Sequence, residues 1–301
     1  MQTLLISKRI ALRHILFLTD FSEPSVAALP FAAMIARSYG AKVTALHVLV
    51  PSTYTYMTPE MAASLLDAEA DNAKAEMSRV EAGLMGLPHE TMFERNIGVW
   101  PVLSKRLEEG DIDLIVIGTH GRTGLSKAVF GSSAEEVFRR TNVPVLTIGP
   151  AVRTGSHNGG RFHCVLFATD FNEVSSVAAS YATSLAQENQ SRLVLLHVLP
   201  SPKPNKGNKS VELSVAEALH RVENLLPADA ELWCRPEPMV EHGQPGAQIL
   251  AVADRCGADL IVLGVRGMDL LTGVATRVER ATAYEVVAHA HCPVLTVRVP
   301  E

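Results

Sequence analysis

The chain has 301 residues, of which 47% are hydrophobic, and its formal net charge is −5. This length and composition suit two ordinary globular domains and exclude an intrinsically disordered chain. The charge divides evenly, at −2 for residues 1–150 and −3 for residues 151–301, so no basic tail or stripe indicates a nucleic-acid partner or a polybasic membrane surface.

The amino-terminal segment MQTLLISKRIALRHILFL is apolar in part, but basic residues at positions 8, 9 and 13 interrupt it before a signal-length hydrophobic core forms. No uninterrupted apolar run is long enough to span a bilayer. The four cysteines show no CxxC spacing, and two of them lie in apolar runs, where small buried hydrophobes are usual. They are Cys164 and Cys292 in such runs, with Cys234 and Cys256 elsewhere. We therefore expect a cytoplasmic protein that does not associate with membranes.

The first half alternates expected strands with expected helices. The strands are residues 15–20, 42–49, 90–96, 113–118 and 144–148, and the helices are residues 24–38, 59–84, 100–109 and 133–141. Ser22 and Thr58 stand before two of these helices as expected N-caps. Because strands and helices alternate, right-handed crossovers predict an α/β fold with a parallel sheet and helices on both of its faces.

The second half repeats the first. Thr-Asp-Phe occurs at 19–21 and 169–171, LHVL at 46–49 and 196–199, DLIV at 113–116 and 259–262, and PVLT at 144–147 and 293–296. Four blocks in the same order indicate a duplicated domain, residues 1–150 and 151–301, because a period of about 150 residues is too long for a solenoid. Residues 152–160 are the expected linker, and Ser201–Ser210 is expected to be an irregular surface loop.

A glycine-rich stretch, IGTHGRTGLSKAVFGSS at 117–133, follows the fourth expected strand. Glycine lets the backbone approach a ligand closely, and the amides that open a helix are donors at a positive dipole end. Ligands of open α/β sheets bind beyond the carboxyl ends of the strands, so this stretch suits a phosphate chain. A structural interpretation stays open, in which Ser132 and Glu135 form a capping box and Gly131 turns the chain.

With this pattern the chain resembles a tandem universal stress protein, and two UspA-type domains account for nearly all of both halves. The nucleotide pattern of that family, Gly-x2-Gly-x9-Gly-Ser/Thr, is matched by Gly118, Gly121, Gly131 and Ser132. The resemblance implies two Rossmann-like domains, each with five parallel strands in the order 3-2-1-4-5. It also implies that ATP, with or without Mg²⁺, lies between strands 1 and 4.

The resemblance also implies a role for individual residues. The implied contacts are Thr19 and Asp20 on the adenosine side, Val48 with adenine through its backbone, Ile117 and Gly118 at the ribose, and Gly121, Gly131, Ser132 and Ser133 at the phosphates. Arg122 suits the phosphate charge, and His120 lies in the same loop either as a phosphate contact or as a solvated histidine. Asp20 taken alone also fits a cap of the following helix. His47 and His197 end apolar strands and are expected to be hydrogen-bonded structural histidines.

The second half departs from the family pattern before its last helix, where it reads RVERATAYEV and the first half reads AVFGSSAEEV. Counting back from the final Pro-Val-Leu-Thr places Arg280 at the position of Gly131, whereas counting forward from the preceding glycines places Arg277 there. Neither count restores the motif, so we expect ATP to bind in the first domain and weakly or not at all in the second. The alternative is that Arg266, Arg277 and Arg280 replace the backbone amides as phosphate ligands. Asp170 and Val198 remain in place, which leaves an adenosine-like pocket open in the second domain.

These patterns favour a nucleotide-dependent regulatory protein over an enzyme. The site region lacks a Walker Lys-Ser/Thr step, paired acidic metal ligands and an evident acid–base pair, although slow ATP hydrolysis stays open. The alternative is a structural or interaction module whose motif is vestigial. Residues 289–292, HAHC, alternate into a strand and converge poorly on a metal. The two halves are expected to pair through their apolar fifth strands, with a homodimer and a regulatory protein partner as further associations.

Overall fold

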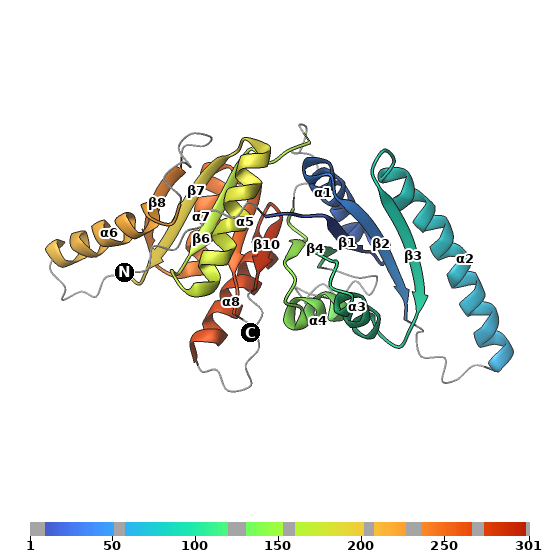
Figure 1. Ribbon diagram of the computed structural model, residues 1–301. Helices are drawn as coiled ribbons and strands as arrows, with labels where there is room; N and C mark the ends of the chain where they lie inside the picture. Colours follow the sequence, from blue (N-terminus) through green and yellow to red (C-terminus); the bar gives the residue numbers. More distant parts are fainter. Residues whose placement is uncertain are drawn as a thin grey trace. The chain divides into compact units, whose positions relative to one another are not determined.

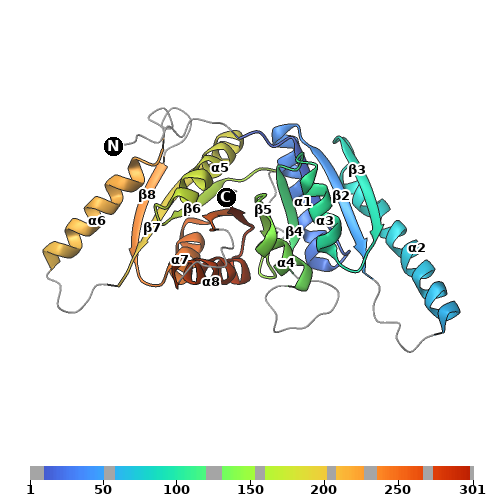
Figure 2. The ribbon, with the colours of Figure 1, turned by 60° about the horizontal axis from the view of Figure 1, so that its bottom comes forward.

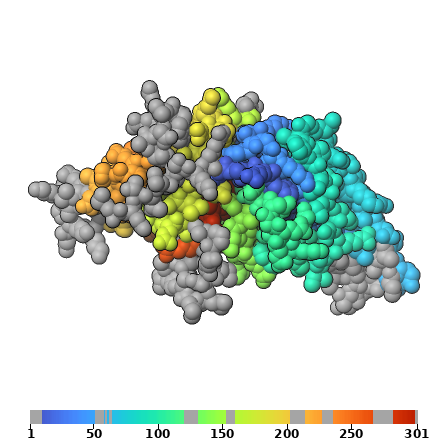
Figure 3. Space-filling model, in the orientation of Figure 1, coloured from blue at the N-terminus to red at the C-terminus, as the bar shows by residue number. Residues whose placement is uncertain are grey.

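The chain folds into two units, each of which alternates strands with helices (Figure 1). The first unit is Ala11–Ile148, and the second begins at Gly149. The computed structural model describes residues 10–50, 58–119, 131–152, 160–201, 208–226, 236–266 and 274–298. The first unit, coloured blue to green, forms one continuous body on the face seen in the space-filling view (Figure 3).

The first unit contains a five-stranded parallel sheet. Its elements are β1 (His14–Leu18), α1 (Glu23–Tyr39), β2 (Lys42–Leu49), α2 (Pro59–Gly83), β3 (His89–Arg95), α3 (Val99–Glu108), β4 (Leu114–Gly118), α4 (Ser132–Arg140) and β5 (Val145–Ile148). The strand order is β3-β2-β1-β4-β5, as the family resemblance implied. Each element expected in the first half is present, with its ends within two residues of the prediction.

The direction of winding reverses between β1 and β4, and this reversal distributes the helices. The chain moves outward from β1 through β2 to β3, then returns across the sheet to β4 and moves outward again to β5. Right-handed crossovers therefore place α1 and α2 on one face and α3 and α4 on the other. Accordingly α1 contacts α2, and α3 lies beside α4 in both ribbon views (Figures 1 and 2). In the described part of the chain, no helix combines the length and hydropathy needed to cross a bilayer.

The core of the first unit lies around the two central strands. All residues of β1 and β4 are buried, and Ile15, Leu16 and Phe17 have no exposed surface. Strands that are covered by helices on both faces require such continuous apolar runs. The end of α1 is fixed by Gly40, whose backbone has a φ of 66° and whose amide donates to the carbonyl of Ala36.

The second unit repeats this arrangement. Its elements are β6 (Cys164–Thr169), α5 (Glu173–Asn189), β7 (Arg192–Leu199), α6 (Asn208–Glu223), β8 (Pro236–His242), α7 (Pro245–Cys256), β9 (Leu260–Gly264), α8 (Val274–His289) and β10 (Val294–Val297). Its strand order is β8-β7-β6-β9-β10, so the expected duplication is confirmed.

One expectation for the second unit is wrong. Ser201–Ser210 was expected to be a loop throughout, but its last three residues, Asn208 to Ser210, form the start of α6. Residues 208–223 contain no proline or glycine, so nothing in this stretch of sequence prevents α6 from beginning at Asn208. Residues 202–207 lie outside the described residues.

An aspartate before the fourth strand of each unit fastens the start of the first strand. Asp113 Oδ2 accepts hydrogen bonds from the amides of Arg13 (2.7 Å) and His14 (2.9 Å), and its own amide donates to the carbonyl of His14 (2.9 Å). In the second unit, the carboxylate of Asp259 accepts hydrogen bonds from the amides of His163 (2.7 Å) and Cys164 (3.0 Å). In each unit the carboxylate thus accepts hydrogen bonds from two backbone amides at the start of the first strand.

We predict that Asp113→Ala lowers the free energy of unfolding of the first unit by about 2 to 3 kcal/mol, because it removes two charge-assisted hydrogen bonds from backbone amides. Glu108→Ala is the matched control, since Glu108 is an exposed carboxylate at the end of α3. Urea unfolding of both variants in a Trp233→Phe background, with Trp100 as the reporter of the first unit, measures the difference. Equal midpoints for the two variants would contradict the prediction.

Candidate functional site

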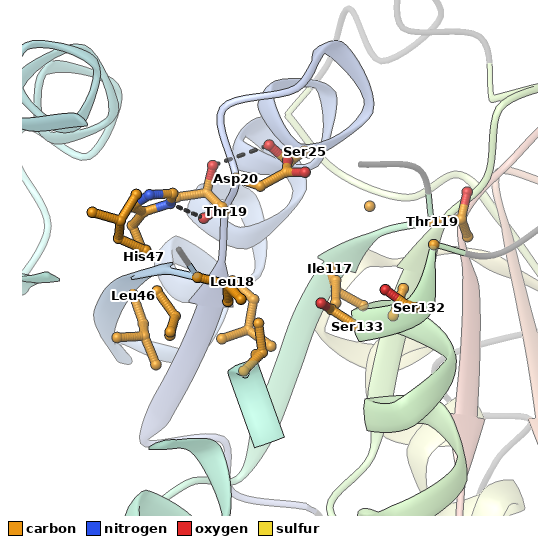
Figure 4. Close-up of a pocket in the computed structure, with 17 residues that line it drawn as sticks. Leu18, Thr19, Asp20, Ser25, Leu46, His47, Ile117, Thr119, Ser132 and Ser133 are labelled. Carbon is orange, nitrogen blue, oxygen red and sulfur yellow. Dashed lines mark hydrogen bonds between the residues drawn. The ribbon is translucent and has the colours of Figure 1, made fainter. Parts of the chain in front are cut away.

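A cavity of about 270 Å³ opens at the carboxyl ends of β1 and β4, where the winding of the first sheet reverses (Figure 4). This is the position at which open α/β sheets bind ligands. Residues from three strand ends and two helix starts are among those that line it: Leu18, Thr19 and Asp20 at the end of β1, Ser25 in the first turn of α1, Leu46, His47 and Val48 of β2, and Ile117, Gly118, Thr119, Gly131, Ser132 and Ser133 around β4 and the start of α4.

The structure brings together eight of the eleven residues expected at the site. Thr19, Asp20, Val48, Ile117, Gly118, Gly131, Ser132 and Ser133 all line this one cavity. The other three, His120, Gly121 and Arg122, lie outside the described residues. The role of these residues in binding stays a prediction.

Thr19 is held by four hydrogen bonds at the end of β1. Its amide donates to the carbonyl of Leu46 (3.0 Å), and its carbonyl contacts Nδ1 of His47 (2.8 Å). Its hydroxyl accepts from the amide of Phe21 (3.1 Å) and shares a hydrogen bond with the hydroxyl of Ser25 (3.0 Å). These bonds tie together β1, β2 and α1, so this wall of the cavity is fixed.

Asp20 orders the turn that leads into α1. Its Oδ1 accepts from the amide (3.0 Å) and the hydroxyl (2.5 Å) of Ser22, and it is half-buried. Ser22 occupies the N-cap position, as expected, but its hydroxyl is directed to Asp20 and makes no cap hydrogen bond. The interpretation of Asp20 as the helix cap is wrong, because the N-cap position lies two residues later. Asp20 instead forms an Asx turn at the edge of the cavity.

The residue after Asp20 has a backbone conformation that the sequence did not reveal. Phe21 has a φ of 62°, and Phe171, its counterpart in the second unit, has a φ of 63°. A left-handed conformation is rare for an aromatic residue, and such strain gathers at functional sites. Each phenyl ring lies 4.4 Å from the ring centre of a histidine, His47 in the first unit and His197 in the second. The repeated Thr-Asp-Phe triplet marks both positions in the sequence, but it does not indicate the left-handed backbone.

Gly118 ends β4 where α1 passes directly over it. A Cβ atom on Gly118 would lie 2.7 Å from the carbonyl group of Pro24 and 2.8 Å from the amide nitrogen of Ser25. At Gly264, the corresponding residue of the second unit, a Cβ atom would lie 3.0 Å from the amide nitrogen of Ser175. Both glycines therefore allow a helix to approach a strand end, whether or not a phosphate is bound.

Gly131 is the N-cap of α4. Its carbonyl accepts from the amide of Glu135 (2.9 Å), and its amide donates to the carbonyl of Thr119 (2.5 Å), which fastens α4 to the end of β4. The capping box of Ser132 with Glu135 is therefore wrong, because a capping box needs the serine at the N-cap and here Ser132 is already helical. The backbone at position 131 has a φ of −66° and a ψ of 152°, a conformation that any residue adopts, so this turn does not require a glycine.

The first turn of α4 opens into the cavity. Ser132, Ser133 and Ala134 line it, and no helical carbonyl precedes their amides. Ser132 and Ser133 stand at the start of α4 beside Ile117, across the cavity from Thr19 and Asp20 (Figure 4). Amides at a helix N-terminus, together with the positive end of its dipole, form a site suited to an anion.

The second unit has a cavity of about 390 Å³ at the corresponding strand ends. Its lining combines equivalent residues with side chains of α7 and α8: Ala168, Thr169, Asp170, Ser175, Leu196, His197, Val198, Pro245, Ile249, Leu263, Gly264, Thr282 and Ala283. The carboxylate at the end of β6 is again used locally, because Asp170 Oδ1 accepts from the hydroxyl of Ser175 (2.7 Å).

The two cavities differ in where the following helix begins. Counting back from the prolines before the fifth strands, Thr282 and Ala283 take the places of Ser133 and Ala134, and both pairs line their cavities. However, α8 begins at Val274, so this pair lies inside the helix. Interior amides donate to carbonyls four residues earlier, and they are unavailable to a ligand.

The histidines at the ends of β2 and β7 have structural contacts. Nδ1 of His197 contacts the carbonyl of Thr169 (2.8 Å), as His47 contacts Thr19, so both histidines have the expected structural role. Burial lowers the pKa of His197 below its ordinary value, which favours the neutral ring. His291 binds a carboxylate oxygen of Asp254 (2.9 Å). Within the described ranges, no three or more His, Cys, Asp or Glu side chains gather as a metal site.

The sequence model of the universal stress protein family matches this chain twice, at residues 11–149 and 161–298. A universal stress protein of Mycolicibacterium smegmatis is 25% identical over 291 residues, which cover 93% of this chain and 95% of that protein. The crystal structure of a universal stress protein from Archaeoglobus fulgidus covers 96% of this chain and 97% of its own, with 22% identity and a TM-score of 0.66, and shares its fold.

A universal stress protein solved in complex with cAMP covers 46% of this chain and 97% of its own, with 23% identity and a TM-score of 0.32. The bound cAMP is a ligand of that protein. A likeness at this level assigns no ligand to the present chain.

We predict that Gly118→Ala destabilises the first unit by about 1 to 3 kcal/mol, because the added carbon meets backbone atoms of α1 that must move away. Gly264→Ala is the matched control in the second unit, where the nearest backbone atom is farther away and the cost is smaller. Differential scanning calorimetry of the two variants measures both shifts. If the unfolding temperature of the first unit were unchanged in Gly118→Ala, the close approach of α1 to β4 would not depend on this glycine.

Proposed function

We propose that this chain, which belongs to the universal stress protein family, is a regulatory protein that binds ATP in its first domain. The observation that carries the proposal is the first turn of α4, whose amides open into the cavity at the ends of β1 and β4. ATP occupancy would then bias a conformation or an interaction with a partner.

The residues of the first cavity fit the parts of ATP. Leu18, Leu46 and Val48 offer an apolar surface and a strand-end backbone to adenine, and Asp20 lies where ribose hydroxyls or an adenine amine would be. Ser132 and Ser133 offer amides and hydroxyls to the phosphates. The cavity of about 270 Å³ suits a nucleoside, with the phosphate chain continuing along the start of α4. Bound Mg²⁺ would neutralise phosphate charge.

We propose binding rather than catalysis as the main activity of this site. Among the described lining residues, Asp20 is the one carboxylate, and its Oδ1 is engaged by Ser22. Rapid phosphoryl transfer usually needs acidic metal ligands and a group that positions the nucleophile. Slow hydrolysis is compatible with this site. A turnover rate of about 1 s⁻¹ or more in the presence of Mg²⁺ would show that the protein is an enzyme.

An interaction module with a vestigial motif is the competing function, and the nucleotide content of freshly purified, acid-denatured protein separates the two. Bound adenine nucleotide supports the proposal, whereas its absence together with no binding in titration supports a bare scaffold. The pairing of the two domains through β5 and β10, a homodimer, a regulatory protein partner and a cytoplasmic location stay predictions.

We predict that Gly131→Val abolishes the phosphate-dependent part of ATP affinity and leaves the fold intact. The backbone of Gly131 has a φ and ψ that valine adopts without strain, so the loss comes from a side chain at the mouth of the anion site. Adenosine binding should weaken less than ATP binding. Titration calorimetry with both ligands, with circular dichroism as the fold control, measures this. An unchanged ATP affinity in the folded variant would remove Gly131 from the site.

We also predict one tight ATP site in the intact chain, located in the first domain. The second domain has helix-interior amides where the first has the free first turn of α4, and each lost charge-assisted hydrogen bond costs about 1.5 to 3 kcal/mol. Losing two of them weakens binding by at least about a hundredfold. The site should disappear in Gly131→Val and persist in Arg280→Ala. Two equivalent sites, or a site lost only in Arg280→Ala, would contradict this asymmetry.

A further inference from the structure

Two cysteines of the second unit, 92 positions apart in the sequence, lie side by side in the fold. The Sγ atoms of Cys164 and Cys256 are 3.9 Å apart, and both side chains are reduced. Cys164 is the first residue of β6 and is buried, whereas Cys256 is the last residue of α7 and is half-buried. We propose that Cys164 and Cys256 form a redox modification site, which hydroperoxides oxidise to a disulfide.

The backbone at each cysteine is held in place by its neighbours. The amide of Cys164 donates to a carboxylate oxygen of Asp259 (3.0 Å), and its carbonyl accepts from the amide of Asp259 (3.0 Å). After Cys256, the left-handed Gly257 ends α7, and the amide of Ala258 donates to the carbonyl of Ala253 (2.8 Å). A disulfide needs a sulfur separation of about 2.05 Å, so the sulfurs approach by about 2 Å through side-chain rotation.

The surroundings assign different roles to the two thiols. The hydrogen bond from Cys164 lowers the pKa of Cys256, and the amide of Ala258 and the positive charge of Arg192 lower it further, while burial opposes them. The hydrogen bond to Cys256 and burial both raise the pKa of Cys164. The half-buried Cys256 is therefore the thiol that reacts first, because the thiolate is the nucleophile. Cys164 is the resolving thiol.

Arg192 supplies the positive charge that helps to lower the pKa of Cys256. It is the residue of β7 that pairs with Cys164, and its Nη1 donates to the carbonyl of Cys256 (3.3 Å). Its Nε and Nη2 donate to the two carboxylate oxygens of Glu237, at 3.0 and 2.8 Å. A bidentate pair of this kind holds the guanidinium in one orientation. The positive charge is therefore held where it opposes the rise in the pKa of Cys164 and helps to lower the pKa of Cys256.

The oxidation has two balanced steps. The Cys256 thiolate attacks the outer oxygen of the hydroperoxide, the O–O bond breaks, and the alkoxide leaves and takes up a proton to become an alcohol. The sulfur of Cys164 then attacks the sulfenic sulfur of Cys256, the S–S bond forms, and hydroxide leaves with the proton of Cys164 as water. Two thiols and one hydroperoxide thus give one disulfide, one alcohol and one water. A dithiol reductant reverses the modification by exchange.

The reactivity of this pair differs from that of the third described cysteine. Cys292 is buried, and burial raises its pKa above the ordinary value. An inert thiol of this kind serves as an internal control. Cys234 lies outside the described residues, and the experiment therefore follows all four cysteines.

The test is peptide mapping of the full-length protein. The reduced and desalted chain is treated with hydrogen peroxide, the remaining thiols are alkylated, and a tryptic digest is analysed by mass spectrometry. We expect peptide 162–192 joined to peptide 256–266, a mass about 2 Da below the sum of the reduced peptides, and full reversal by dithiothreitol. Before oxidation, Cys256 should be alkylated at least about tenfold faster than Cys292.

Variants separate the two roles. Cys164→Ser should abolish the disulfide and leave a sulfenic acid on Cys256 that dimedone traps, while Cys292→Ser, the matched control, should keep the disulfide. A peroxide-treated wild-type chain with both cysteines alkylatable would overturn the proposal, and so would a disulfide from either one to Cys234 or Cys292. The peptide map of the wild-type chain tests the proposal even if Cys164→Ser does not fold. The presence or absence of the disulfide in that map does not depend on ATP binding.

Discussion

The close approach of α1 to the end of β4 is the contact on which the first cavity depends. Only a residue without a side chain fits at Gly118, because α1 backbone atoms lie 2.7 Å from the position of a Cβ atom. This approach brings Ser25 within 3.0 Å of the Thr19 hydroxyl and sets the wall between β1 and β4. The same contact exists at Gly264. A glycine at the end of the fourth strand is therefore required by the packing of the fold, and it is not by itself evidence of a phosphate site.

The feature that distinguishes the two domains is the starting point of one helix. α4 begins at Ser132, at the edge of its cavity, whereas α8 begins eight residues before Thr282, the counterpart of Ser133. A helix offers free amides only in its first turn, so this shift converts potential anion donors into partners of internal carbonyls. Two domains with the same sheet, the same aspartate turn and the same helix contact therefore present different chemistry to a ligand.

The sequence predicted the elements of the first half within two residues, because strands buried on both faces and amphipathic helices leave clear periodic patterns. It predicted less of the site. The capping box at Ser132 and the cap at Asp20 were wrong, since a one-residue or two-residue change in the helix start alters which group caps it. The left-handed backbone of Phe21 leaves no pattern, because residue type favours it only for glycine and asparagine.

The proximity of Cys164 and Cys256 was invisible in the sequence for a different reason. A separation of 92 positions forms no local spacing motif. The two residues meet only because β6 pairs with β7 and β9, and α7 leads directly into β9. Contacts of this kind depend on the order of strands in the sheet. A sequence pattern reveals them only after the topology is known.

The redox pair and the second cavity lie at opposite ends of the same strands. Cys164 is at the start of β6, whereas the cavity is lined by residues at the end of β6, so oxidation of the pair does not place a group in the cavity. α7 connects the two places, because Pro245 and Ile249 line the cavity and Cys256 ends the helix. Any influence of the disulfide on a ligand there must therefore pass through α7. By thermodynamic linkage, a ligand favoured by the disulfide would favour disulfide formation to the same degree.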